Sequence, residues 1–183
     1  IIILKKKYTK KEKFTIPIVC VGNIYLGGTG KTPLCIEISE IFKKLNKKNA
    51  IIKKFYKAHN DEFKLIESKK IKLFKDKSRS TAIRKAISEN LDCVVLDDGF
   101  QDSSIVKNLN IVCFNEKQLA GNERTLPSGP LREPLSSLKN SQIVVINGNE
   151  NKVFEERIKS ISRDVGIYYS NYLPTNLNIF AGQ

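Results

Sequence analysis

The chain of 183 residues is 40% hydrophobic and 28% charged, which is enough apolar material for the core of one globular domain. Its formal net charge of +13 favours polyanionic partners such as nucleotides, nucleic acid or an anionic membrane surface without choosing among them, and codon bias in an AT-rich genome would produce the same excess of lysine. No apolar run approaches the roughly 20 residues of a membrane-spanning helix, and the four cysteines, expected in the core, include no CxxC pair that would suggest a zinc or redox centre.

The first four residues, Ile1 to Leu4, are apolar and could end a hydrophobic anchor or form an ordinary strand. Next, a β-branched run at residues 16–21 predicts a strand, and apolar residues at helical spacing predict a helix over 32–44. Further along, the patterns predict strands at 50–52, 71–74, 93–96, 110–114, 143–146 and 167–172, helices at 80–90 and 153–162, and a long loop at 122–135. Strands that alternate with helices indicate an α/β fold with a parallel sheet covered on both faces.

A glycine-rich segment between the first strand and the first helix has the composition of a phosphate-binding loop. Lys31 would reach the β- and γ-phosphates of a nucleotide, and the Thr32 hydroxyl would ligate Mg²⁺. The strict pattern GxxxxGK[ST] requires glycine where the chain has Tyr25, so the match is degenerate, and a turn that binds nothing is the alternative. The predicted nucleotide-binding residues are Gly27, Gly28, Thr29, Gly30, Lys31 and Thr32.

Two acidic pairs are candidates for metal ligation and proton transfer. Asp97 and Asp98 end an apolar strand, as expected of the strand that organises Mg²⁺ beside a phosphate-binding loop, although they could also be acidic turn residues. Asp61 and Glu62 could supply a base for a hydroxyl nucleophile and a metal ligand, or form a solvated surface pair. His59, the only histidine, could share a face with Asp61 on an extended segment or be an ordinary loop residue.

Three strings together are more specific than any of these motifs alone. They are Val-Gly-Asn-Ile and Gly-Gly-Thr-Gly-Lys-Thr-Pro within residues 21–33, Leu-Asp-Asp-Gly-Phe-Gln at 96–101, and Leu-Pro-Ser-Gly-Pro-Leu-Arg-Glu-Pro at 126–134. In this order and spacing they resemble the tetraacyldisaccharide 4'-kinase family, also called the lipid A 4'-kinases. The resemblance runs from about residue 17 to the end of the chain.

The resemblance implies a P-loop NTPase-like fold, a mostly parallel sheet with helices on both faces. It also implies ATP as co-substrate, Mg²⁺ as cofactor, and phosphate transfer to the 4'-hydroxyl of a tetraacyldisaccharide 1-phosphate in lipid A (lipopolysaccharide) biosynthesis. The partners would be ATP, this lipid A precursor and the anionic surface of the bacterial inner membrane, on its cytoplasmic face.

The resemblance also assigns roles to individual residues. Asn60-Asp61-Glu62-Phe63 aligns with Gly-Asp-Glu-Pro of the family, so Asp61 resembles the catalytic aspartate, with Lys31 as the second catalytic group and Glu62 as a metal-site residue. Arg132 is similar to a residue associated with the substrate cleft. The chain departs from the family pattern at Asn60 and Phe63, and at Asp102, where the family has histidine.

The resemblance implies that residues 1–183 are the nucleotide-binding domain of a larger enzyme, with a membrane anchor before it and a histidine-bearing lobe after it. The alternative function is a soluble P-loop ATPase or ligase that acts on a small molecule. A nucleic-acid-binding module rests on charge alone, and we expect no nucleic-acid partner because the sequence has no stacking motif or recognition helix.

Overall fold

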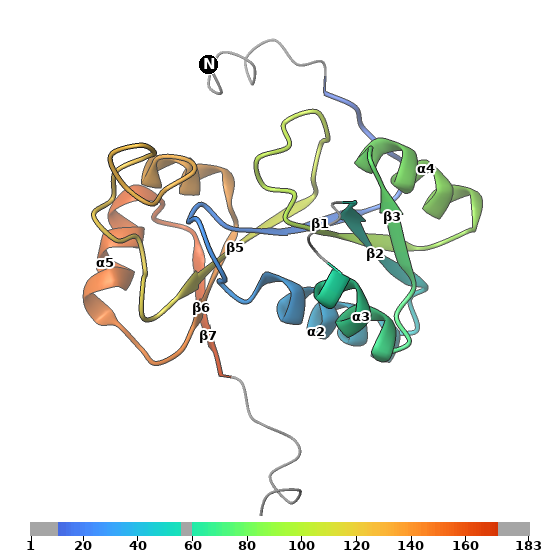
Figure 1. Ribbon diagram of the computed structural model, residues 1–183, viewed down its shortest axis with the longest axis horizontal. Coiled ribbons are helices and arrows are strands. Elements are labelled where there is room, and N and C mark those ends of the chain that lie inside the picture. Colours follow the sequence, from blue (N-terminus) through green and yellow to red (C-terminus); the bar gives the residue numbers. More distant parts are fainter. Residues whose placement is uncertain (1–10, 56–59, 172–183) are drawn as a thin grey trace, which may run out of the picture.

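The structure of the protein, a computed structural model, describes residues 11–55 and 60–171, so Ile1 to Leu4 and His59 lie outside it. Seven parallel strands form one sheet in the order β3-β2-β4-β1-β5-β6-β7 (Figure 1). The strands are β1 (Ile18–Gly22), β2 (Asn49–Lys54), β3 (Leu73–Asp76), β4 (Cys93–Asp97), β5 (Leu109–Asn115), β6 (Ile143–Asn147) and β7 (Gly166–Ser170). The helices are α2 (Lys31–Lys44), α3 (Asn60–Ser68), α4 (Arg79–Ser88) and α5 (Lys152–Ile161), with a 3₁₀ helix η2 (Leu135–Asn140).

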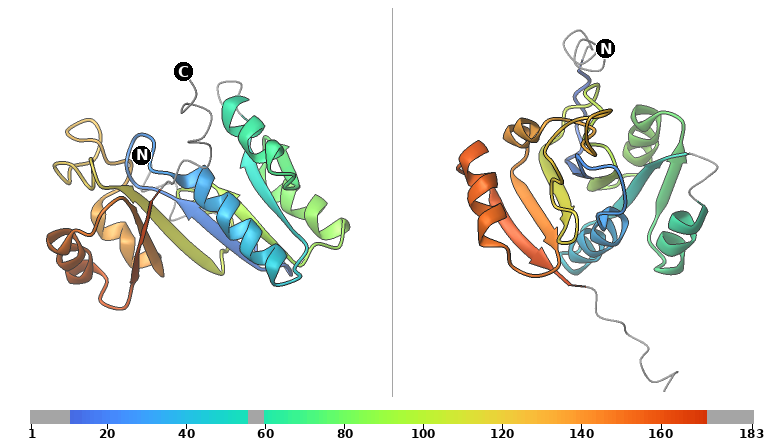
Figure 2. Two further views of the ribbon diagram at one scale, coloured as in Figure 1. Left: turned by 90° about the horizontal axis from the view of Figure 1, so that it is seen from below. Right: turned by 60° about the vertical axis from the view of Figure 1, so that its left-hand side comes forward.

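Helices cover both faces of the sheet, as the views in Figures 1 and 2 show. On one face, Cys35 and Ile36 of α2 and Ile66 of α3 pack with Val21 and Val95 of the central strands. On the other face, α4, η2 and α5 contribute Ile83, Leu138 and Ile158 to a cluster that includes Cys20, Leu96 and Val112 from the sheet. Because successive side chains of a strand point to opposite faces, a strand buried on both faces is apolar without interruption, as the sequence predicted.

The predicted elements agree with the observed ones to within about two residues at each end, which is the usual uncertainty of such boundaries. Residues 122–135 contain no helix and only isolated bridges, of Leu131 with Tyr25 and with Thr125, before η2 begins. All four cysteines are buried free thiols. In the part of the chain that the structure describes, no helix is long and apolar enough to span a bilayer.

Helix α3 was not predicted, and Asp61 lies in this helix and not in the extended segment that the sequence analysis considered. The helix begins at Asn60 and carries Asp61 and Glu62 in its first turn, where negative charge interacts favourably with the helix dipole. Phe63 and Ile66, three residues apart, are buried beneath it. Leu65 between them is exposed, so two buried apolar residues give too weak a period to reveal a helix of this length in the sequence.

Candidate functional site

The glycine-rich loop joins β1 to α2 at the carboxyl edge of the sheet. Gly27 and Gly30 have φ angles of 138° and 82°, a region that favours glycine. Gly30 is the N-cap of α2 and no side chain caps this helix, whereas Ser78 and Asn151 accept capping hydrogen bonds at α4 and α5. The first amides of α2 are therefore available to bind an anion.

Asn23 and Tyr25 hold the loop in shape. Asn23 is fully buried, and its side-chain amide donates to Thr29 Oγ1 over 3.0 Å and to the Gly27 carbonyl over 3.3 Å. Tyr25 forms an antiparallel bridge with Leu131, and the adjacent Leu26 N–H donates to the Pro130 carbonyl over 2.9 Å. Tyr25 has a negative φ, so the position where the strict pattern has glycine does not require glycine here.

The loop meets the acidic end of β4 because β1 and β4 are neighbours, with Val21 paired to Asp97. Lys31 Nζ lies 3.6 Å from Asp98 Oδ1, and the Thr32 hydroxyl donates to Asp97 Oδ2 over 2.8 Å. These residues face a cavity of about 780 Å³. It is lined by Leu26, Gly27, Gly28, Thr29, Gly30, Lys31, Thr32, Pro33, Lys53, Lys54, Glu62, Leu65, Arg79, Asp97, Asp98 and Arg132.

Asp97 is completely buried and its two oxygens differ in their surroundings. Oδ2 accepts hydrogen bonds from Thr32 and from the Lys53 ammonium, while Oδ1 is buried without a hydrogen-bond partner among the described residues. Lys53 is itself 4% exposed and also pairs with Glu62 Oε2 over 2.6 Å. Burial lowers the pKa of Lys53, but the charges and hydrogen bonds of Asp97 and Glu62 outweigh burial and raise it.

Asp98 is held by Arg132, which comes from the long loop. The two terminal guanidinium nitrogens donate to Asp98 Oδ2 over 3.3 Å and Oδ1 over 3.2 Å, and one of them also donates to Asn23 Oδ1. Burial would raise the pKa of Asp98, yet the positive charges of Lys31 and Arg132 keep it below its ordinary value. Asp98 is therefore ionised at neutral pH.

The structure brings Lys31, Thr32, Glu62, Asp97, Asp98 and Arg132 to one cavity, together with the glycines of the loop. Asp61 is adjacent to Glu62 in the chain, but its side chain is exposed and it is not among the described residues that line this cavity. The predicted base therefore lies beside the site and not inside it.

Three cationic residues that line the cavity, Lys53, Lys54 and Arg79, were missed by the sequence analysis. Lys53 and Lys54 together end the apolar strand β2, where a pair of lysines gives no sign that the first of them is buried. Arg79 begins α4 and donates to the backbone carbonyl of Asp98 over 2.7 Å, while its ion pair with Asp102 spans 3.2 Å. Asp102, which stands where the family has histidine, thus orients an arginine beneath the end of β4.

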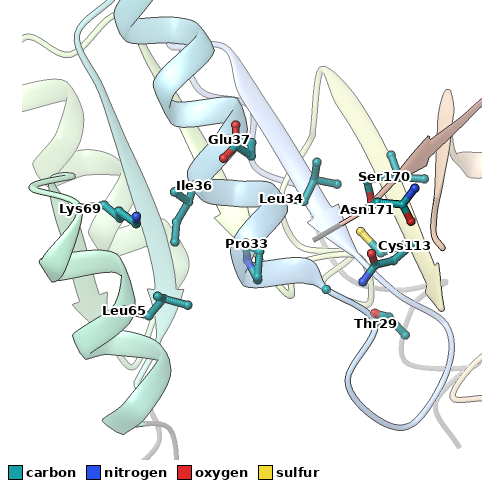
Figure 3. Close-up of a pocket in the computed structure, with 13 residues that line it drawn as sticks. Thr29, Pro33, Leu34, Ile36, Glu37, Leu65, Lys69, Cys113, Ser170 and Asn171 are labelled. Atoms are coloured by element: carbon teal, nitrogen blue, oxygen red, sulfur yellow. The ribbon is translucent and has the colours of Figure 1, made fainter. Parts of the chain in front are cut away.

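A second cavity, of about 550 Å³, adjoins the first (Figure 3). Thr29 and Gly30 of the loop, Pro33 of α2 and Leu65 of α3 border both cavities. The second is lined mainly by apolar atoms, from Pro33 and Leu34 of α2 and from Cys113 of β5 among others. Ser170 and Asn171, at the end of β7, close its far side.

A comparison with protein families matches residues 2–178 to the family described as tetraacyldisaccharide-1-P 4'-kinase. The chain belongs to this family. The resemblance inferred from the three sequence strings is thus confirmed.

Individual members of the family resemble the chain over most of its length. The tetraacyldisaccharide 4'-kinase of Pelagibacter ubique is 47% identical over 179 residues, which cover 95% of this chain and 57% of that protein. The enzyme of Pseudomonas putida (strain GB-1) is 31% identical over 152 residues, or 73% of this chain and 46% of that protein. The chain spans about half the length of these relatives.

Solved structures share the fold. LpxK from Aquifex aeolicus, crystallised in complex with ATP, superposes with a TM-score of 0.68 at 19% identity, covering 98% of this chain and 78% of that one. The hydrogenase maturation factor HypB from Archaeoglobus fulgidus has a TM-score of 0.61 at 13% identity, covering 85% and 81%. These likenesses confirm the predicted P-loop NTPase-like fold.

Proposed function

We propose that the chain binds ATP and takes part in transfer of the γ-phosphate to the 4'-hydroxyl of a tetraacyldisaccharide 1-phosphate, a step of lipid A biosynthesis. One observation carries the proposal: Lys31 and Thr32 of the loop contact Asp98 and Asp97 within a single cavity, in a chain of this kinase family. The crystallised relative from Aquifex aeolicus has ATP bound, which supports ATP as the nucleotide.

The two cavities suggest how a nucleotide is divided between them. The triphosphate would lie against the amides at Gly27 to Gly30 and against Lys31, with positive charge from Arg132 and Arg79 nearby. The adenine base would enter the mainly apolar second cavity, which adjoins the first. Both parts of the nucleotide would then contact Thr29 and Gly30.

The residues present fit a magnesium ion. The unpartnered buried oxygen of Asp97 and the nearby Thr32 hydroxyl are hard oxygen donors, and Mg²⁺ commonly takes one or two carboxylates together with phosphate oxygens and water. Among the described residues, no group of three or more His, Cys, Asp or Glu side chains could hold a metal ion by itself. Phosphate oxygens of the bound nucleotide would therefore complete the coordination. When bound, the ion neutralises charge on the phosphates; Asp98 and Glu62 would act through its water shell.

The acceptor would approach from the side of α3. Asp61 is the proposed base for the 4'-hydroxyl, since it is exposed at the start of this helix beside Glu62. Arg132 would border the acceptor as well as hold Asp98. The net charge of +13 favours docking on the anionic cytoplasmic face of the inner membrane, where the acyl chains of the acceptor reside.

The test is transfer of labelled γ-phosphate to a tetraacyldisaccharide 1-phosphate in mixed micelles, measured in the full-length protein with Lys31→Ala and Asp61→Ala variants. We expect both variants to lose most of the activity. Asp61→Ala should retain ATP binding, whereas Lys31→Ala should weaken it about 100-fold. ATP consumption that is indifferent to the lipid but responds to a small soluble acid would instead establish the ATPase or ligase alternative.

A further inference from the structure

The ammonium of Lys53 lies among the oxygens that would face the metal. Its Nζ donates to Thr32 Oγ1 over 3.3 Å and to Asp97 Oδ2, and pairs with Glu62 Oε2 over 2.6 Å. Thr32, Asp97 and Glu62 were each predicted as metal-site residues. A cation supplied by the chain therefore contacts the same three side chains.

The strand register explains why this lysine is there. Lys53 is paired with Asp97 across β2 and β4, and both residues are buried. A carboxylate removed from water without a compensating cation is strongly destabilising, so the ammonium stabilises Asp97 when no other cation is present. The four-carbon stem of lysine is flexible, and the Glu62 side chain is 46% exposed, so the ammonium can move toward Glu62 and away from Asp97.

We propose that Lys53 is a resident cation that holds Asp97 Oδ2 and the Thr32 hydroxyl in the nucleotide-free chain, next to the Oδ1 open to magnesium, and that it withdraws from them when the metal binds. An ammonium and a divalent ion bound to the same carboxylate repel each other, so the two cations compete for the Asp97 and Thr32 side chains. Lys53 thereby keeps the buried Asp97 neutralised before ligand arrives, and weakens binding of free metal. The inference rests on the proposed function, because it concerns the metal of that same site.

The size of the effect follows from site occupancy. If Lys53 holds the oxygens in about nine molecules of ten, the apparent metal affinity is about tenfold weaker than the intrinsic affinity. Removing the ammonium should therefore raise the apparent metal affinity about tenfold, to its intrinsic value. A lysine that only stabilised the fold would leave metal affinity unchanged when replaced.

The informative variant is Lys53→Met, which retains an unbranched apolar side chain and removes the charge. Its matched control is Lys75→Met: Lys75 is the β3 partner of Lys53 in the sheet register, but its ammonium pairs with Glu67 at 2.5 Å. Both variants remove a lysine from the same row of the sheet. Only one of them removes a charge from Thr32 and Asp97.

The experiment titrates Mn²⁺, detected by electron paramagnetic resonance, into nucleotide-free chain, and records melting curves in EDTA and in saturating Mg²⁺. We expect Lys53→Met to bind Mn²⁺ about tenfold more tightly than wild type and Lys75→Met. We also expect it to melt below wild type in EDTA, with the deficit closing in Mg²⁺. Equal or weaker Mn²⁺ binding by Lys53→Met would overturn the proposal.

If Lys53→Met does not fold, the wild-type chain decides. Competitive acetylation of lysines, read by mass spectrometry, should show Lys53 becoming severalfold more reactive when Mn²⁺ is added, with Lys75 unchanged. Unchanged reactivity of Lys53 at saturating Mn²⁺ would equally refute the exchange of cations. Wild-type ATP binding, measured alongside, separates the two hypotheses, because a chain that binds ATP normally but fails these tests loses only this inference.

Discussion

The two cavities beside the phosphate-binding loop share Thr29, Gly30, Pro33 and Leu65 but differ in chemistry. Half of the residues that line the larger cavity are ionisable, five cations against three carboxylates. Among the described residues, the smaller cavity has only Glu37 and Lys69 as charged lining residues, and its walls are mainly apolar. In the proposed function, the charged cavity would therefore bind the triphosphate by electrostatic interactions, and the apolar cavity would bind the adenine base by shape.

The stability of the fold should depend on the ion pairs inside the charged cavity. Asp97→Asn should have the largest effect. The substitution leaves the buried Lys53 without its closest carboxylate, and breaking such a pair destabilises a fold by about 3 kcal/mol. Urea unfolding measures the change. Asp92→Asn is the control, because Asp92 is exposed and its carboxylate accepts a surface hydrogen bond from the Lys48 N–H. Equal effects of the two variants would show that the pairing contributes little.

Lys31→Ala should weaken ATP binding about 100-fold, as expected for loss of a charged donor to phosphate. Binding of inorganic tripolyphosphate should weaken by the same factor, because Lys31 would contact only the phosphates. Calorimetric titration of both ligands provides the measurement. Lys43→Ala in the last turn of the same helix, where the lysine pairs with Glu40, should leave both affinities unchanged.

Ser170→Trp addresses the apolar cavity. An indole at the end of β7 would fill part of the space, so ATP should bind about tenfold more weakly, equivalent to roughly 1.4 kcal/mol, while tripolyphosphate is unaffected. Tyr168→Trp, on the same strand but exposed, is the control. If tripolyphosphate binding weakened as much as ATP binding, the assignment of the adenine base to this cavity would be wrong.

The smallest expected effect is the pH dependence that comes from Asp98. Its pKa is lowered in the folded chain, so the stability it contributes is complete above the ordinary carboxyl range of about 4 and is lost as pH falls through the lower folded value. Wild type should therefore be more stable than Asp98→Asn at neutral pH, and the difference should vanish in acid. Asn tolerates the positive φ of 56° at this position, so the comparison introduces little strain. A constant difference across the acid range would contradict the ion pairs seen here.

The sequence was sufficient for the central sheet and for the loop. Strands β1, β4 and β5 are buried on both faces, which makes them continuous apolar runs, and the glycines fall at the junction of a strand and a helix. Because parallel strands end at one edge, the meeting of Lys31 with Asp98 was also predictable.

The remaining features depend on long-range pairing. Lys53 and Asp97 are 44 residues apart, and only the register of β2 against β4 places them together. Arg79 approaches Asp98 because α4 packs beside β2 and β3, which no local pattern specifies. Helix α3 was missed because a short helix with two buried residues gives little periodicity, and Asp61 was therefore not predicted to lie in a helix.

The bridge between Tyr25 and Leu131 has a consequence for protein engineering. Arg132 also donates to the Tyr25 carbonyl, so the glycine-rich loop and residues 122–135 are fastened together at adjacent positions. A chimera that received residues 22–30 of this chain without residues 122–135 would lose these hydrogen bonds, and nothing would hold the transferred loop in its conformation. A transfer of the proposed nucleotide site to another protein therefore requires both segments, which are about 100 residues apart in the sequence.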